Sequence, residues 1–304
     1  MRHLINITDL TPDEIEDLLN LADAMRANPR DWGESQRGRI LATLFFEPST
    51  RTRLSFESAM LSLGGGVLGF SSADSSSSAK GESLQDTVCT VSCYADIIAM
   101  CHPKEGAPMA AQYTSEVPII NAGDGGHNHP TQTLTDLMTI RREHGHLGDM
   151  TIGLCGDLKF GRTVHSLILA LIRYPGVRFL LISPPELRLP EYLLNTLRDQ
   201  GIPFEEHQAM EEALPRLDFL YMTRVQKERF FNEADYVRLK DTYILTPEKL
   251  RLASPALRVL HPLPRVNEIS TQVDADPRAI YFDQVRNGRY VRMALITRML
   301  EDFA

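Results

Sequence analysis

The chain of 304 residues is long enough for two domains of ordinary size, and its hydrophobic content of 43% is typical of a globular protein. The formal net charge of −8 argues against a nucleic-acid-binding protein, because such proteins usually carry excess positive charge. The longest apolar runs fall far short of the ~18 residues that a membrane-spanning helix needs. The N-terminal residues lack the apolar core of a signal peptide, and the four cysteines include no CxxC pair. We therefore expect a cytoplasmic protein that binds neither a membrane nor a nucleic acid.

The first predicted helix begins after Thr11 and ends before Pro29. Thr11 and Glu14 form a capping-box pattern, and Pro12 suits the first helical position. Apolar residues then recur at helical spacing as far as Met25. We expect this helix to serve the fold rather than the chemistry.

Residues 41–64 predict a strand, a tight turn and a helix. The run from Leu41 to Phe46 is apolar, as in a buried strand, and Gly64 stops the helix that follows. The first helical turn carries three hydroxyl groups and two arginines, in the run Ser49-Thr50-Arg51-Thr52-Arg53. A helix N-terminus has positive partial charge and free N–H groups, so two cations there indicate a bound anion such as phosphate. The alternative is two solvated arginines on a helix face.

A serine-rich loop and three further strands follow. Residues 67–70 predict a strand, 71–82 a flexible serine-rich loop, 82–94 a helix, 95–101 a strand and 117–121 another strand. A glycine-rich turn then leads to a helix that begins at Pro130 and ends at Gly145. Asp124, His127 and His129 near this turn leave a metal site open as an alternative, although their spacing suits a metal poorly.

The second half begins with a buried strand at residues 150–155 and a glycine-containing loop. The loop nearly matches a nucleotide-binding P-loop in the spacing of Gly156, Gly161, Arg162 and Thr163, with a strand before it and a helix after it. The P-loop lysine is absent, because Arg162 stands in its place. A nucleotide-binding protein is therefore a rival hypothesis.

Strands and helices then alternate, which indicates a parallel sheet. Residues 178–183 and 218–222 predict strands, and residues 191–200 and 211–214 predict helices. Arg224 and Gln226 follow the last of these strands, at the end where open α/β sheets bind ligands. Two prolines, Pro262 and Pro264, predict a stiff extended loop, and residues 279–303 predict a C-terminal helix.

The expected fold class is α/β, with two domains that each hold a mostly parallel sheet flanked by helices. We place the first domain at residues 1–135 and the second at residues 136–285. Helices near the middle of the chain and at the C-terminus would bridge the two domains. Residues 286–304 would pack back on the first domain.

A family resemblance begins in the run Phe45-Phe46-Glu47-Pro48-Ser49-Thr50-Arg51-Thr52-Arg53. This run resembles the carbamoyl-phosphate signature of the aspartate and ornithine carbamoyltransferases. The His-Pro-x-x-Gln pattern at residues 129–132 is similar to a second motif of the family, and the resemblance extends over residues 3–303. Arg224, Gln226 and Pro262 are similar to the aspartate branch. The resemblance implies that residues 1–135 bind carbamoyl phosphate and residues 136–285 bind aspartate.

The implied reaction transfers a carbamoyl group from carbamoyl phosphate to the α-amine of L-aspartate, a step of pyrimidine biosynthesis. The resemblance assigns carbamoyl-phosphate binding to Ser49, Thr50, Arg51, Thr52, Ser76, His129 and Gln132. It assigns aspartate binding to Lys80, Arg162, Arg224, Gln226 and the backbone carbonyls of Leu263 and Pro264. It implies catalytic roles for Arg51, Thr52, Lys80 and His129.

The resemblance also implies a homotrimer with shared active sites, because Ser76 and Lys80 would enter the site of a neighbouring subunit. It implies no metal and no organic cofactor, and it leaves open whether a regulatory chain binds. Cys101 departs from the family pattern, which has an arginine that contacts the phosphate and the carbonyl oxygen of carbamoyl phosphate. A thiol replaces neither contact well. A weakened enzyme, a non-catalytic paralogue and compensation by another basic residue therefore all stay open.

Overall fold

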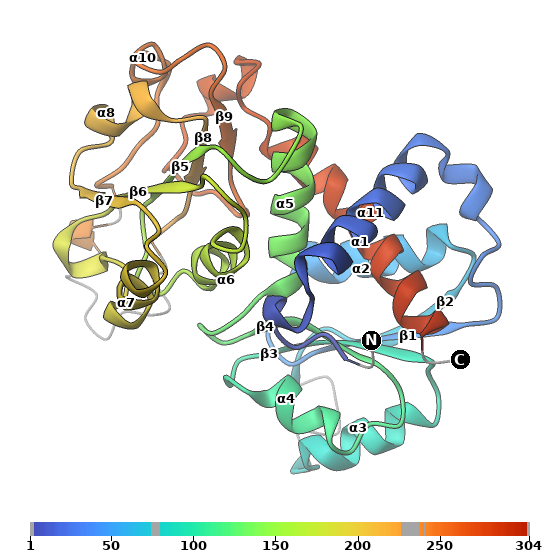
Figure 1. Cartoon of the computed structure of the whole chain (residues 1–304). Helices are drawn as coiled ribbons and strands as arrows, with labels where there is room; N and C mark the ends of the chain where they lie inside the picture. Colours follow the sequence, from blue (N-terminus) through green and yellow to red (C-terminus); the bar gives the residue numbers. More distant parts are fainter. Residues whose placement is uncertain (1–2, 74–79, 226–236, 240, 303–304) are drawn as a thin grey trace. The chain divides into compact units, whose positions relative to one another are not determined.

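The computed structural model describes residues 3–73, 80–225, 237–239 and 241–302. The chain forms two compact units, of which the first comprises residues 1–138 and 286–304 and the second residues 139–285 (Figure 1). Two helices, α5 (Pro130–His144) and α11 (Tyr281–Glu301), each contribute residues to both units.

The first unit is built on a four-stranded parallel sheet with the strand order β2-β1-β3-β4. Its strands are β1 (Ile40–Phe45), β2 (Gly66–Phe70), β3 (Ile97–His102) and β4 (Ile119–Asp124). Its other described α-helices are α1 (Pro12–Ala27), α2 (Thr50–Ser62), α3 (Leu84–Ser92) and α4 (Ala107–Gln112). Leu44, Ile98 and Met100 pack in one cluster with Val88 of α3 and Ala111 of α4. Helices α3 and α4 therefore cover one face of the sheet, and α1 and α2 lie on the other face (Figure 1).

The second unit holds a five-stranded parallel sheet with the strand order β7-β6-β5-β8-β9. Its strands are β5 (Thr151–Cys155), β6 (Arg178–Ile182), β7 (Phe204–His207), β8 (Phe219–Met222) and β9 (Arg258–Leu260). Its described α-helices include α6 (Arg162–Leu171), α7 (Glu191–Asp199), α8 (Met210–Ala213) and α10 (Pro247–Leu250). Cys155, Leu180 and Leu220 pack with Met210 and Leu250, so α8 and α10 cover one face of this sheet.

Two parallel sheets flanked by helices confirm the expected fold class. The capping box of α1 is also confirmed, because Thr11 Oγ1 accepts from Glu14 N at 3.2 Å and the Glu14 carboxylate accepts from Thr11 N at 2.7 Å. The helix expected from residue 82 begins at Leu84, since Ser83 caps it. In the described part of the chain, none of the helices combines the length and the apolar character needed to cross a membrane.

The loop around the two prolines differs from the expectation of an extended segment. Leu263 has a φ of 55°, in the left-handed region, and the Leu263–Pro264 peptide bond is cis. The prediction of an extended loop is therefore wrong at Leu263, where the chain turns sharply.

Candidate active site

The carboxyl ends of the first sheet's strands bring several polar segments to one edge. Parallel strands run in the same direction, so the segments that follow β1, β3 and β4 all leave the sheet at this edge. Glu47 follows β1, Cys101 and His102 end β3, and Asp124 ends β4. The chain continues from β1 into α2 and from β4 into α5.

The N-terminus of α2 carries hydroxyl groups and an exposed arginine. Ser49 is the N-cap residue, and its side chain makes no capping hydrogen bond. The first turn contains no acidic residue, although acidic side chains are favoured at this end of a helix. Thr50 and Arg51 are exposed, and Thr52 is half-buried. Helix N–H groups, hydroxyls and a guanidinium together suit an anion.

The two arginines of this turn have different surroundings. Arg53 donates from Nε to Glu57 Oε1 at 2.7 Å, and Thr43 Oγ1 donates to the same oxygen at 3.0 Å. Arg53 is therefore held along α2 by an ion pair with the residue four positions later. Arg51 is exposed at the helix end, between Thr50 and Thr52.

Cys101 is fully buried at the end of β3, next to β1. Cys101 pairs with Phe45 in the sheet register, and its carbonyl oxygen accepts from Phe46 N at 2.8 Å. The Cys101 thiol lies 3.5 Å from Glu47 Oε1, within reach of a weak S–H hydrogen bond. Cys101, which departs from the family pattern, therefore adds no positive charge at this edge. Its thiol lies beside the Glu47 carboxylate.

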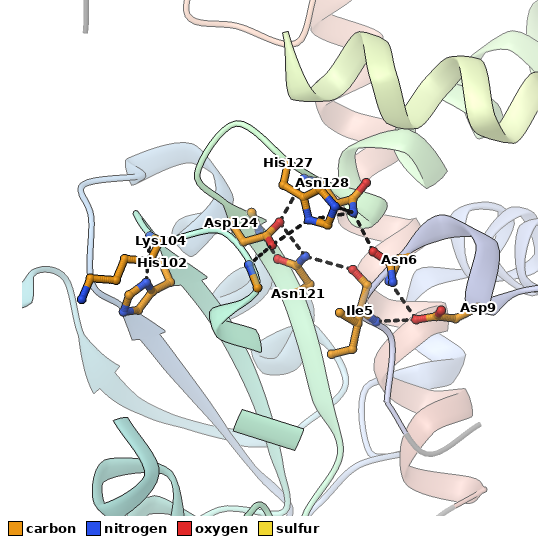
Figure 2. A network of polar contacts seen from close by, with 11 residues as sticks. Ile5, Asn6, Asp9, His102, Lys104, Asn121, Asp124, His127 and Asn128 are labelled. Carbon is orange, nitrogen blue, oxygen red and sulfur yellow. Dashed lines mark hydrogen bonds and ion pairs between the residues drawn. The ribbon is translucent and has the colours of Figure 1, made fainter. Parts of the chain in front are cut away.

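A hydrogen-bond network centred on Asp124 fixes the turns at this edge (Figure 2). The Asp124 carboxylate, which is 1% exposed, accepts from Gly106 N at 2.9 Å. It also accepts from Asn128 N at 3.0 Å and from Asn121 Nδ2 at 3.1 Å. Because Gly106 lies beyond β3 and Asn128 precedes α5, Asp124 ties these two segments together.

The metal alternative finds no support in this network. A ring nitrogen of His127 lies 3.1 Å from Asp124 and another 3.2 Å from Asn128 Nδ2, so the imidazole belongs to the hydrogen-bond network. Among the residues that the structure describes, no group of three or more His, Cys, Asp or Glu side chains is arranged to hold a metal ion.

His129 and Gln132 lie at the start of α5. The carbonyl oxygen of His129 accepts from Gln132 N at 3.0 Å, and the His129 side chain is nearly buried. Thr131 Oγ1 lies 3.5 Å from His129 Nδ1. In the tautomer in which this hydroxyl donates to Nδ1, the ring proton is on Nε2, which is then a hydrogen-bond donor. Gln132 Nε2 donates to Asp136 Oδ1 at 2.7 Å.

Two predicted site residues, Ser76 and Gln226, lie outside the described residues. Lys80 is described, and its side chain is exposed. The roles of these three residues stay predictions.

The second sheet gathers other predicted residues at its own carboxyl edge. Arg162 begins α6 after β5, Arg224 comes two residues after β8, and His261 follows β9. Thr223 Oγ1 accepts from Asp157 N at 3.0 Å, which ties the segment after β5 to the segment after β8. This unit therefore holds Arg162, Arg224 and the loop after His261 at one edge of one sheet.

The backbone of residues 156–163 does not support the P-loop hypothesis. In a P-loop, backbone N–H groups point at the phosphates of a nucleotide. Here Leu158 N donates to Leu187 O at 3.1 Å, inside the protein. Phe160 N donates to Asp157 Oδ1 at 2.9 Å, and Arg162 N donates to Phe160 O at 3.0 Å. These N–H groups are used within the chain and form no cradle for phosphate.

A buried histidine and glutamate shape the loop that carries Leu263 and Pro264. His261 Nε2 lies 2.7 Å from Glu268 Oε1, and His261 Nδ1 accepts from Leu263 N at 2.7 Å. Glu268 Oε2 accepts from Val266 N at 2.9 Å. The N–H of Leu263 is thereby used inside the loop.

The protonation of this pair follows from its burial. Burial lowers the pKa of His261 below its usual value, and the nearby charges of Arg265 and Arg224 act in the same direction. Burial alone would raise the pKa of Glu268, but hydrogen bonds from His261 and from backbone N–H groups hold that pKa below its usual value. A neutral His261 that donates from Nε2 to a charged Glu268 agrees with both shifts. Sequence reasoning missed this pair, whose only signal was a histidine and a glutamate flanking two prolines.

Family models match most of the chain. The carbamoyl-P binding domain of aspartate/ornithine carbamoyltransferase matches residues 2–142, and the Asp/Orn binding domain matches residues 148–299. The chain is 62% identical to an aspartate carbamoyltransferase catalytic subunit of Lachnoclostridium phytofermentans, over 99% of the chain and 98% of that protein. It is also 62% identical to the subunit of the same name from Finegoldia magna, over 98% of each chain.

Solved structures agree with these matches. The catalytic subunit of M. jannaschii aspartate transcarbamoylase is 46% identical, with a TM-score of 0.92 over 99% of both chains. Aspartate transcarbamoylase from Trypanosoma cruzi, solved with N-(phosphonacetyl)-L-aspartic acid, is 39% identical, with a TM-score of 0.91 over 97% of this chain and 95% of that one. The chain therefore belongs to the aspartate/ornithine carbamoyltransferase family, and within it to the aspartate carbamoyltransferase catalytic subunits.

Proposed function

We propose that the protein transfers the carbamoyl group of carbamoyl phosphate to the α-amine of L-aspartate. The products are N-carbamoyl-L-aspartate and phosphate, for pyrimidine biosynthesis in the cytoplasm. The observation that carries the proposal is the N-terminus of α2, where no acidic residue stands in the first turn. Ser49, Thr50, Arg51 and Thr52 at this helix end suit the dianionic phosphate of the donor.

The protein would catalyse this reaction mainly by positioning two reactants and by stabilising the negative charge that develops. The amine nitrogen of aspartate bonds to the carbamoyl carbon, and the bond from that carbon to the phosphate oxygen breaks. Thr52 and His129 Nε2–H would donate to the carbonyl oxygen as it becomes negative. The leaving phosphate would accept the proton that the amine loses, with Arg51 balancing its charge. No metal or organic cofactor takes part in this scheme.

The second unit would hold aspartate. Arg162 and Arg224 would bind its two carboxylates, together with Gln226 and Lys80. The backbone carbonyls of Leu263 and Pro264 would accept from amino groups. Their placement is supported by the buried His261–Glu268 pair that shapes this loop.

We also propose a homotrimer with shared sites, in which Ser76 and Lys80 serve a neighbouring subunit. Mixing subunits tests this directly. Arg51→Ala and Lys80→Ala proteins would each be inactive, whereas a mixture reassembled after mild dissociation would regain activity, because some sites would combine two intact halves. A mixture as inactive as its parents would contradict the shared site.

A second candidate is an impaired enzyme or a non-catalytic member of the family. The observation that favours it is Cys101, whose thiol lies 3.5 Å from the Glu47 carboxylate where the family pattern has an arginine. Losing one oxyanion donor costs on the order of 10²–10³ in rate. A protein that is stabilised by carbamoyl phosphate and aspartate but forms no product would establish the non-catalytic candidate.

The test of the proposed function uses the two arginines of α2 as a matched pair. Arg51→Ala should abolish N-carbamoyl-L-aspartate formation and leave the fold intact, because Arg51 is exposed. Arg53→Ala should keep most of the activity, because Arg53 pairs with Glu57. A fully active Arg51→Ala protein would contradict the proposed phosphate site.

A further inference from the structure

Gln132 contacts a buried carboxylate on its own helix. Gln132 and Asp136 are four residues apart on α5, so their side chains lie on the same face. Gln132 Nε2 donates to Asp136 Oδ1 at 2.7 Å, and Asp136 is fully buried. A carboxylate only accepts hydrogen bonds, so it faces the NH2 group of the amide. The carbonyl oxygen of Gln132 is therefore turned away from Asp136.

A buried arginine of α11 interacts electrostatically with this carboxylate. Arg292 Nη1 donates to Gly288 O at 3.0 Å and to Thr135 Oγ1 at 3.4 Å. Burial lowers the pKa of Arg292 to about 10, and the negative charge of Asp136 acts in the opposite direction. Arg292 thus stays protonated at neutral pH, and it places a positive charge near Asp136.

Gly288 of α11 leaves space for the Arg292 side chain next to Thr135 of α5. A Cβ atom at Gly288 would lie 2.7 Å from Arg292 Nη1 and 3.1 Å from Thr135 Oγ1, so only glycine fits there without a shift. Two buried opposite charges are a weak source of stability, because apolar residues of similar size often serve as well. Their structural effect is to hold the Asp136 carboxylate as a fixed hydrogen-bond acceptor for Gln132.

We propose that Asp136 is a positioning residue that orients Gln132 as a hydrogen-bond acceptor for the amino group of the carbamoyl donor. The proposal deepens the proposed function and rests on it. With Oε1 facing the ligand, Gln132 accepts from an NH2 group and gains nothing from a methyl group. With the amide reversed, two NH2 groups would face each other. Asp136 thereby sets the preference for carbamoyl phosphate over acetyl phosphate, which has a methyl group in place of the amino group.

The test measures the binding of three ligands by isothermal titration: carbamoyl phosphate, acetyl phosphate and inorganic phosphate. Asp136→Asn keeps the size of the side chain but no longer dictates which end of the Gln132 amide it meets. We expect the affinity for carbamoyl phosphate to fall on the order of tenfold, as for the loss of one hydrogen bond. The affinities for acetyl phosphate and for inorganic phosphate should stay unchanged.

Three control variants separate orientation from folding. Gln132→Met removes the acceptor directly and should cause the same selective loss. The double variant Asp136→Asn with Gln132→Met should lose no more than either single variant, because both changes remove one interaction. Asp136→Asn with Arg292→Met removes both buried charges, which proteins often tolerate, and should repeat the selective loss in a folded protein.

The outcomes distinguish this proposal from the proposed function. Three results would overturn the role of Asp136 and leave the proposed function standing. They are an equal loss of affinity for all three ligands, no loss of affinity for carbamoyl phosphate, and additive losses of affinity in Asp136→Asn with Gln132→Met. A failure of both the unchanged protein and Cys101→Arg to bind carbamoyl phosphate would overturn the proposed function itself.

Discussion

The two sheet edges hold their candidate residues by different means. At the first edge, side chains stand at the starts of α2 and α5, where helix N–H groups add positive partial charge. At the second edge, the buried His261–Glu268 pair shapes the loop of Leu263 and Pro264, because His261 accepts from Leu263 N. At the first edge, changes of charge should therefore have the largest effect on activity. At the second edge, the loss of a buried hydrogen-bond partner should have the largest effect.

The largest expected effect is on the rate of carbamoyl transfer, when positive charge is added at the first edge. Cys101→Arg adds a guanidinium beside Glu47 and should raise the rate of carbamoyl transfer, on the order of 10²–10³ if the arginine stabilises the oxyanion. Initial rates over a wide range of carbamoyl phosphate concentrations measure this. Cys101→Ser is the matched control and should leave the rate near that of the unchanged protein. An equal gain in both variants would show that charge is not the cause.

A smaller effect is expected from Glu268→Gln at the second edge. The amide keeps one acceptor for His261 but turns an NH2 group toward Val266 N, so the loop loses a charged hydrogen-bond partner worth roughly 1.5–3 kcal/mol. The KM for aspartate should rise, while the affinity for carbamoyl phosphate should stay the same. Glu206→Gln, which removes an exposed ion pair with Arg188, is the control and should change neither. Equal losses for both substrates would contradict the separation of the two edges.

The smallest effect concerns pH and the same buried pair. Because the pKa of His261 is lowered in the folded protein, the unfolded chain binds a proton near pH 6.5 that the folded chain does not. The stability that this group contributes is present above pH 6.5 and should be lost as the pH falls below it. Urea unfolding between pH 8 and pH 5 measures the slope, and His261→Gln should reduce it. An unchanged slope in His261→Gln would mean that another group is responsible.

Local patterns were enough to predict the first edge but could not separate its two arginines. The strand, the turn and the hydroxyl-rich helix start are neighbours in the sequence, so the anion site could be predicted there. A spacing of four residues permits an ion pair between Arg53 and Glu57, but the spacing alone does not show that the pair forms. Nothing local indicated that the carboxylate of Glu57 also accepts from Thr43 on β1.

Other features depend on tertiary contacts. Strand β7 was not predicted, because Glu205 and Glu206 make it polar and, among the described strands, it pairs only with β6 as an outer strand of the sheet. Helix α4 was not predicted, because six residues are too few for a clear helical period. The Arg292 side chain meets Thr135 from a helix 157 positions away in the chain. No local sequence pattern indicates a contact between residues so far apart in the chain.

The most direct test of the central claim is the formation of N-carbamoyl-L-aspartate by the purified protein from labelled carbamoyl phosphate and L-aspartate. The Cys101→Arg protein should be assayed beside it. We expect slow, saturable product formation by the unchanged protein and faster formation by Cys101→Arg. No product from either protein at any concentration of carbamoyl phosphate would contradict the assignment as a carbamoyltransferase and favour a non-catalytic role.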